Sequence, residues 1–268
     1  VPINENGHRA LATFEPATGL LKQKAHTDVH FRERVYTRLY AKSADAWFAQ
    51  IQQEKIAPNQ EQLAYLQDIR ARCETEAREL KAYASSSKRK QVSEPYRKGL
   101  LGPPGTGKSE CLRWTRRFFE EVLGWTHGVQ FQMVAPQHTM ALLIGGGTVH
   151  WFGQVPINAT GMQQRGGKKG EQDVDELFER TQSLRWLLID EIEALAAVVF
   201  GILHGNLCKA MSRSPYAKRK DGTQRPFGGV NLSLSGDWWQ LPPVKKIGFY
   251  SNPFESDMDY TEQLAMSF

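Results

Sequence analysis

The feature that most constrains this chain is a glycine-rich octapeptide at residues 102–109, with the sequence Gly-Pro-Pro-Gly-Thr-Gly-Lys-Ser. It fits the pattern G-x-x-x-x-G-K-[ST], and the residues around it predict a short strand ending at Leu101 and a helix from about Lys108 to Leu123. In such a turn the glycines let backbone amides point inward around a phosphate, and the helix N-terminus adds its positive dipole. A chance glycine-rich turn is the alternative, but it would not require the flanking strand and helix. The octapeptide therefore predicts a site for a nucleoside triphosphate.

Two side chains of the octapeptide are suited to ATP with Mg²⁺. Lys108 can reach the β- and γ-phosphates, and the hydroxyl of Ser109 can ligate Mg²⁺. We expect the whole octapeptide to bind the nucleotide, that is, Gly102, Pro103, Pro104, Gly105, Thr106, Gly107, Lys108 and Ser109.

An acidic pair at the end of an apolar strand is the expected partner of this loop. Residues 187–191 read Leu-Leu-Ile-Asp-Glu, so the strand delivers Asp190 at its carboxyl end, where it can hold Mg²⁺ through water. Glu191 can orient or deprotonate the attacking water. The alternative is a helix N-terminus that carries acidic residues because the dipole favours them. Together with the octapeptide, the pair predicts a catalytic role for Lys108, Asp190 and Glu191.

Strands and helices alternate along the second half of the chain. Strands are predicted at 129–134, 184–189 and 230–235, and an amphipathic helix at 192–211 with Leu195, Val198, Ile202 and Leu203 on one side. Helical spacing also occurs at 28–55 and 60–83. This alternation predicts an α/β fold in which helices cover both faces of a parallel sheet.

Composition excludes several classes of protein and leaves nucleic-acid binding open. The net charge is +5 and the pI is about 9.1, which permits contact with nucleic acid without requiring it. The three cysteines are far apart, so a disulfide framework and a zinc site are not expected, and a reducing, intracellular compartment fits. The longest apolar run, 194–203, is too short to span a bilayer, so no membrane partner is expected.

A third segment points to one family. Residues 236–244 read Gly-Asp-Trp-Trp-Gln-Leu-Pro-Pro-Val and resemble the third helicase motif of the Pif family and its RecD-like relatives in superfamily IB. The resemblance implies a RecA-like fold, and it implies that Gln240 senses the γ-phosphate and couples it to the DNA groove.

Further segments resemble the same family in the same order. Val134-Ala135-Pro136 resembles a segment that touches the DNA backbone, although Gln137 and His138 stand where Thr-Gly is usual. Residues 146–150, Gly-Gly-Thr-Val-His, resemble another segment near single-stranded DNA. Residues 58–62 resemble the family's adenine-reading segment, with Pro58 in place of Leu. The resemblance therefore implies DNA contacts at Pro136, Gln137, Thr148 and His150, and nucleotide contact at Gln62. The alternative for His150 is packing in the core, and the alternative for Gln62 is an ordinary surface position. Trp151 beside them is a candidate for base stacking or for core burial.

The resemblance spans residues 58–245 and implies an ATP-dependent DNA helicase that unwinds duplex DNA in repair, recombination or telomere maintenance, in the nucleus or mitochondrion of a eukaryote. We expect a helical N-terminal extension at 1–55, a RecA-like lobe at 56–250 and the start of a following region at 251–268. A second RecA-like lobe would supply arginine to the ATP, so the 268-residue chain alone is expected to hydrolyse ATP weakly or not at all. The alternatives are an AAA-type ATPase that remodels proteins, and a non-catalytic module that holds nucleotide or DNA without turnover.

Overall fold

The computed structural model describes residues 43–84, 92–156, 176–243, 247–248 and 251, together with the backbone of 12–15 and 20–23. The two short ranges form an antiparallel pair, β1 (Ala12–Glu15) with β2 (Leu20–Gln23). Most of the helical pattern predicted at 28–55 lies outside the described residues. Among the described helices, none combines the length and the apolar character that a bilayer crossing requires.

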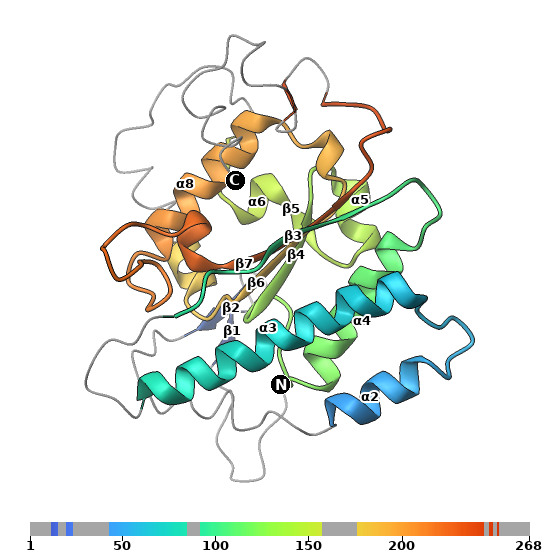
Figure 1. The fold of residues 1–268 in the computed structure, drawn as a ribbon. Helices are drawn as coiled ribbons and strands as arrows, with labels where there is room; N and C mark the ends of the chain where they lie inside the picture. Colours follow the sequence, from blue (N-terminus) through green and yellow to red (C-terminus); the bar gives the residue numbers. More distant parts are fainter. Residues whose placement is uncertain are drawn as a thin grey trace.

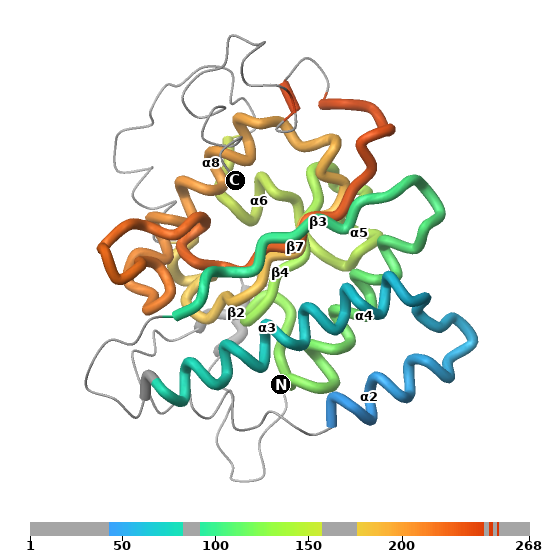
Figure 2. Tube along the Cα trace, viewed as in Figure 1, coloured from blue at the N-terminus to red at the C-terminus, as the bar shows by residue number. Residues whose placement is uncertain are grey.

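A five-stranded parallel sheet organises the rest of the chain (Figure 1). Its strands, in spatial order, are β3 (Arg97–Leu101), β7 (Asn231–Gly236), β6 (Trp186–Ile189), β4 (Phe131–Ala135) and β5 (Gly147–Thr148). The predicted strands are confirmed with shifts of one or two residues at their ends. Because all five run the same way, the segments that follow them leave from one edge, as the tube in Figure 2 shows for the stretches after β3 and β7. The α/β fold with a parallel sheet is therefore confirmed.

Alternate residues of the central strand face opposite sides of the sheet. In β6, Trp186 and Leu188 join one buried cluster, whereas Leu187 and Ile189 join another. A strand buried on both faces reads as a continuous apolar run, which explains why the sequence predicted it so clearly.

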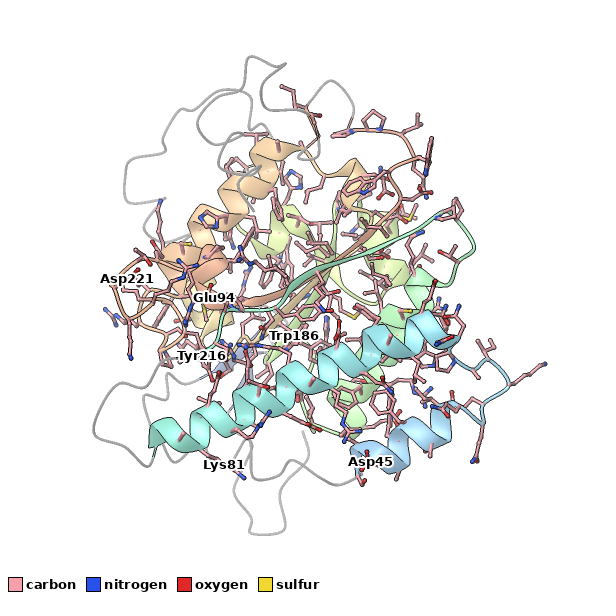
Figure 3. All side chains as sticks on the ribbon, in the orientation of Figure 1. Asp45, Lys81, Glu94, Trp186, Tyr216 and Asp221 are labelled. Carbon is pink, nitrogen blue, oxygen red and sulfur yellow. The ribbon has the colours of Figure 1, made fainter. Side chains whose placement is uncertain are left out.

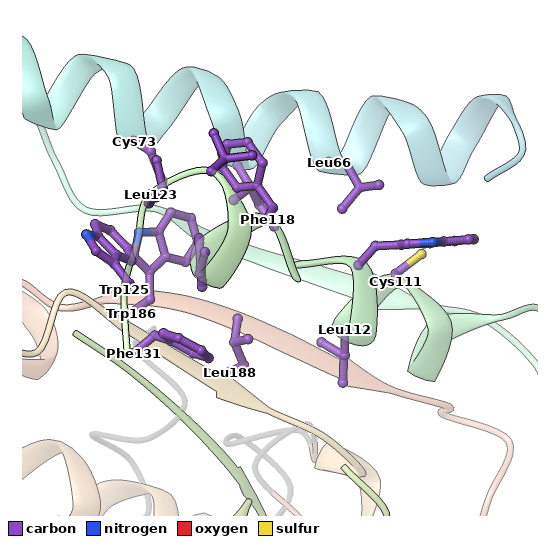
Figure 4. Close-up of a cluster of buried hydrophobic side chains, with 14 of the residues drawn as sticks. Leu66, Cys73, Cys111, Leu112, Phe118, Leu123, Trp125, Phe131, Trp186 and Leu188 are labelled. Atoms are coloured by element: carbon purple, nitrogen blue, oxygen red, sulfur yellow. The ribbon is translucent and has the colours of Figure 1, made fainter. Parts of the chain in front are cut away.

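Three helices cover the first face. They are α2 (Ala44–Ile51), α3 (Gln60–Ala84) and α4 (Lys108–Glu121), and Figure 4 shows Leu66 and Cys73 of α3 above Phe118 of α4 and the strand residues Trp186 and Leu188. The predicted helices at 60–83 and 108–123 are thus confirmed.

The short helix α2 belongs to this same core. Ser43 caps its first turn, and Trp47 is completely buried, with its ring 5.4 Å from that of Phe118 and its indole N–H donating to Glu121 at 3.0 Å. Residues of the predicted N-terminal extension therefore pack against the core under the first face of the sheet, and the domain limits at 55 and 250 remain predictions.

The second face is covered by α6 (Val149–Phe152), α8 (Ala197–Ala210) and the 3₁₀ turn η2 (Pro226–Gly229). The prediction of one continuous helix at 192–211 is wrong. A 3₁₀ turn, η1 (Ile192–Ala194), comes first, and the backbone of Leu195 and Ala196 is extended before α8 begins. The apolar spacing continued through the break because Leu195 is buried in the same core as the helix that follows.

Candidate nucleotide site

The loop between β3 and α4 is shaped to accept an anion. Gly105 and Gly107 have φ values of 80° and 84°, a region that residues with a side chain rarely adopt. In the described part of the chain, the backbone amides of residues 105–109 donate to no protein acceptor. Open amides at a helix N-terminus are the groups that bind phosphate, so the loop predicted from the octapeptide has a suitable donor set.

Lys108 reaches back across this loop. Its Nζ donates to the carbonyl oxygens of Gly102 at 2.6 Å and Pro103 at 3.0 Å, and Thr106 Oγ1 donates to the same Pro103 carbonyl at 2.8 Å. The ammonium is therefore held over the loop, while Ser109 is exposed on the first turn of α4.

The start of α3 lies against the same loop. Gln62 Nε2 donates to the carbonyl of Thr106 at 3.0 Å, and Gln62 Oε1 accepts from the backbone N–H of Asn59 at 2.9 Å. A Cβ on Gly107 would collide with Gln62 Nε2. The structure thus brings Gln62 to the loop, and its contact with a nucleotide stays a prediction.

The two carboxylates that follow β6 lie at the same edge of the sheet. Asp190 is buried and beside Ser235; burial raises its pKa, an effect that the Ser235 hydroxyl and the charge of Lys108 oppose. The charge of Lys108 also acts to lower the pKa of Glu191. The structure therefore places Lys108 close enough to Asp190 and Glu191 to act on both.

Glu191 has an unusual backbone and an unusual acidity. Its φ and ψ of 55° and 47° lie in the left-handed region, where a non-glycine residue is strained. A hydrogen bond with Glu193, burial, and the charges of Glu193 and Asp190 raise the pKa of Glu191 to about 8.

Glu193 was not predicted as part of the site. Its side chain is only 2% exposed, and its Oε2 accepts from the backbone N–H of Asp237 at 3.0 Å. The sequence offered one signal, an acidic residue in an otherwise apolar stretch, but the expected continuous helix hid its position.

The segment after β7 lies beside these carboxylates. The Gly102 N–H donates to the Gly236 carbonyl at 3.3 Å, which joins the two strand ends. The Asp237 carboxylate accepts from the N–H of Trp239 at 3.0 Å and from Nε2 of Gln240 at 3.3 Å. Gln240 is exposed at the end of this turn.

The residues expected to touch DNA lie at the same edge of the sheet, at the carboxyl ends of β4 and β5. Ala135 pairs with Thr148 in the sheet, so Pro136 and Gln137 leave β4 next to the start of α6. Thr148 caps α6 by accepting from the N–H of Trp151 at 3.2 Å, and His150 is half-buried within the same helix.

Trp151 is half-exposed, at 48%, and Arg180 lies 4.8 Å from its ring centroid. Core burial, the alternative for this residue, is therefore wrong. A Cβ at Gly147 would collide with the Trp151 ring, so the indole lies directly over the backbone of β5.

Two arginines of the loop before β7 form hydrogen bonds at the opposite edge of the sheet, where the strands begin. Arg219 donates to both carboxylate oxygens of Glu94, at 2.7 and 2.8 Å, and Arg225 donates to Glu94 at 3.2 Å. Glu94 precedes β3, whereas the phosphate loop follows it, and Figure 3 shows Glu94, Tyr216 and Asp221 grouped at that end. These arginines are therefore not placed to contact a nucleotide.

The sheet order, the open loop after β3 and the carboxylates after β6 define a P-loop nucleotide-binding protein of the RecA-like class. The profile described as PIF1-like helicase matches residues 99–260, and the chain belongs to this family. An AAA-type ATPase, which the octapeptide left open, is thereby set aside.

Curated relatives match over about half of the chain or more. The ATP-dependent DNA helicase RRM3 of Saccharomyces cerevisiae is 30% identical over 155 residues, 54% of this chain and 18% of that protein. The ATP-dependent DNA helicase PIF1 of Homo sapiens is 31% identical over 153 residues, 55% of this chain and 20% of that protein. The chain thus spans about a fifth of the length of these relatives. The crystal structure of Pif1 helicase from Candida albicans aligns with a TM-score of 0.48 and 23% identity, covering 74% of this chain and 37% of that one.

Proposed function

We propose that this chain is the first motor lobe of an ATP-dependent DNA helicase, which binds and hydrolyses ATP to translocate on single-stranded DNA and unwind duplex. The observation that carries the proposal is the convergence of three strand ends. The open amides after β3, the carboxylates after β6 and the Gln240 segment after β7 share one edge of the sheet. The relatives named ATP-dependent DNA helicases support the same activity.

The amides of residues 105–109 and the ammonium of Lys108 would bind the phosphates. For the phosphates to take Lys108, its Nζ must leave the carbonyls of Gly102 and Pro103, to which it donates here. Ser109 and Asp190 would hold Mg²⁺, which supplies positive charge to the phosphate oxygens when bound. Their donor types, a hydroxyl and a carboxylate, fit a hard cation.

Glu191 would act as the general base. Its carboxylate would take a proton from water as the water oxygen attacks the γ-phosphorus and the bond to the β-phosphate oxygen breaks. Gln62 would stabilise the phosphate loop through its hydrogen bond with the Thr106 carbonyl. Gln240 would sense the γ-phosphate and couple it to the DNA-binding residues.

Pro136, Gln137, Thr148 and His150 would contact single-stranded DNA. Their position at the carboxyl ends of β4 and β5, beside the nucleotide site, supports this assignment. Arginine for the transition state would come from a second RecA-like lobe, because Arg219 and Arg225 are held at the far edge by Glu94. A nuclear or mitochondrial location and a role in repair, recombination or telomere maintenance fit such a helicase.

The test is single-turnover hydrolysis of ATP by the chain, with and without a single-stranded oligonucleotide. We expect slow hydrolysis that the oligonucleotide stimulates and that Glu191→Gln abolishes. Absence of nucleotide binding, or hydrolysis that Glu191→Gln leaves unchanged, would contradict the proposal.

A further inference from the structure

Glu193 joins the turn at residues 191–194, which carries Glu191, to the end of β7. On one side, the carboxyl group of Glu193 lies beside that of Glu191, whose pKa it raises. The other side of this bridge is the 3.0 Å hydrogen bond that Glu193 Oε2 accepts from the N–H of Asp237, the residue that follows β7.

The backbone around this bridge is built to receive it. A Cβ on Gly236 would collide with Glu193 Oε2 and would lie 2.5 Å from Cγ1 of Ile192, so glycine is required for the close approach of the two segments. A carboxylate this deeply buried, at 2%, persists only where hydrogen bonds compensate for lost water.

The bridge also explains how Glu191 keeps its strained backbone. A left-handed conformation at a non-glycine residue is maintained only when the surrounding structure holds it. The turn η1 provides part of that hold, with the N–H of Ala194 donating to the Glu191 carbonyl at 3.1 Å. Glu193 adds a tertiary attachment, because it fixes the same turn to β7.

Resting on the function proposed above, we propose that Glu193 is a positioning residue for hydrolysis. It holds the turn at residues 191–194, and with it Glu191, against the segment after β7 that carries Gln240. Asp237 connects the two segments, because its N–H donates to Glu193 and its carboxylate accepts from Nε2 of Gln240.

The test compares three substitutions in the 268-residue chain by single-turnover hydrolysis with the protein in excess over ATP. Glu193→Gln keeps the length of the side chain; its Oε1 can accept from Asp237 and its Nε2 can donate to Glu191. Glu193→Asp is one methylene too short to reach both partners, and Glu193→Ala has no polar group. Glu179→Gln is the matched control, because Glu179 is exposed and forms no bridge among the described residues.

We expect Glu193→Gln to hydrolyse within about threefold of the wild-type rate, whereas Glu193→Asp and Glu193→Ala lose about tenfold or more, since a misplacement of about 1 Å can lower a rate by 10². Affinity for Mg·ATP, measured by calorimetry, should stay within about twofold in all variants, which separates a loss in the chemical step from a loss of binding. If Glu193→Ala fails to fold, the hydrolysis rates of Glu193→Asp and Glu193→Gln decide between the two outcomes.

Wild-type rates in Glu193→Asp and Glu193→Ala, with ATP binding and turnover intact, would overturn the positioning role and leave the proposed function standing. Equal losses in Gln, Asp and Ala variants would also overturn it, because hydrogen-bond geometry would then not be the cause. Absence of ATP binding by the wild-type chain would instead reject the proposed function itself.

Discussion

Gln62 donates its side-chain N–H to the carbonyl of Thr106 at 3.0 Å, and this bond fixes the start of α3 to the phosphate loop. The same side chain accepts from the N–H of Asn59, while the Gln62 N–H donates to Asn59 Oδ1 at 2.9 Å. Both polar groups of the Gln62 amide are therefore engaged with backbone, and its direct effect is on the loop.

Gln62→Ala should weaken the binding of ATP and GTP by similar factors. Loss of one hydrogen bond is worth about 1 kcal/mol, or about fivefold in affinity. Calorimetric titration of both nucleotides measures the effect, with Gln67→Ala, an exposed position on the same helix, as control. A loss confined to ATP would contradict this role and would show that Gln62 reads the base.

Hydrolysis should depend on pH through Glu191. The hydrogen bond with Glu193, burial and neighbouring carboxylates raise the pKa of Glu191 to about 8, and a protonated carboxyl cannot accept a proton from water. The second-order rate constant for ATP hydrolysis should therefore rise with pH and level off above about pH 8, since it reports on the free protein.

The control for this profile is Glu191→Gln, which should still bind Mg·ATP while its rate falls by about 10²–10⁴-fold and the pH dependence disappears. A flat profile between pH 6 and 9 in the wild-type chain, or full turnover in Glu191→Gln, would remove Glu191 as the base.

Trp151 should contribute to the binding of single-stranded DNA. Its ring is half-exposed beside Thr148 and His150, and base stacking on an aromatic side chain is worth about 1–3 kcal/mol. Trp151→Ala should lower the affinity for an oligothymidylate in fluorescence anisotropy without changing its salt dependence, because each phosphate contact contributes about −0.7 to that slope and no charge is removed. Ile56→Ala, which changes an exposed apolar residue between α2 and α3, serves as control. Unchanged affinity in Trp151→Ala would exclude stacking at this site.

Removal of Trp47 should destabilise the motor core. The side chain is fully buried against Phe48 and Phe118, and replacing such a residue by alanine costs about 3–5 kcal/mol. Urea unfolding of Trp47→Ala and of Gln50→Ala, which is exposed on the same helix, measures the difference. A free energy of unfolding within about 0.5 kcal/mol of wild type, as for a surface change, would mean that α2 is not part of this core.

The parts of the fold that follow from local pattern were predictable. The octapeptide, the apolar run of β6 and the acidic pair after it each depend on a few adjacent residues, and the sheet places them together by its parallel topology. Apolar spacing predicted α3 and α4, but it also continued through Leu195 and hid the break before α8.

What the sequence left open depends on contacts between distant residues. The role of Glu193 requires the N–H of Asp237, 44 positions away, and a glycine at 236 that makes room for it. Exposure of Trp151 depends on how α6 lies over β5, because a period of 3.6 residues cannot distinguish faces in a helix of four residues. The attachment of Gln62 to the loop likewise joins residues 44 positions apart.

The central claim, that residues 102–109 bind the phosphates of ATP, is tested most directly by calorimetric titration of Mg·ATP into the wild-type chain and Lys108→Ala. Lys98→Ala, which removes an exposed lysine of β3 that pairs with Asp68, is the matched control. The substitution at Lys108 should cost about 1.5–3 kcal/mol of binding free energy, the range for hydrogen bonds to charged groups, and the control should bind as wild type does. Equal affinity of Lys108→Ala and the wild-type chain, with both folded, would contradict the assignment of the nucleotide site.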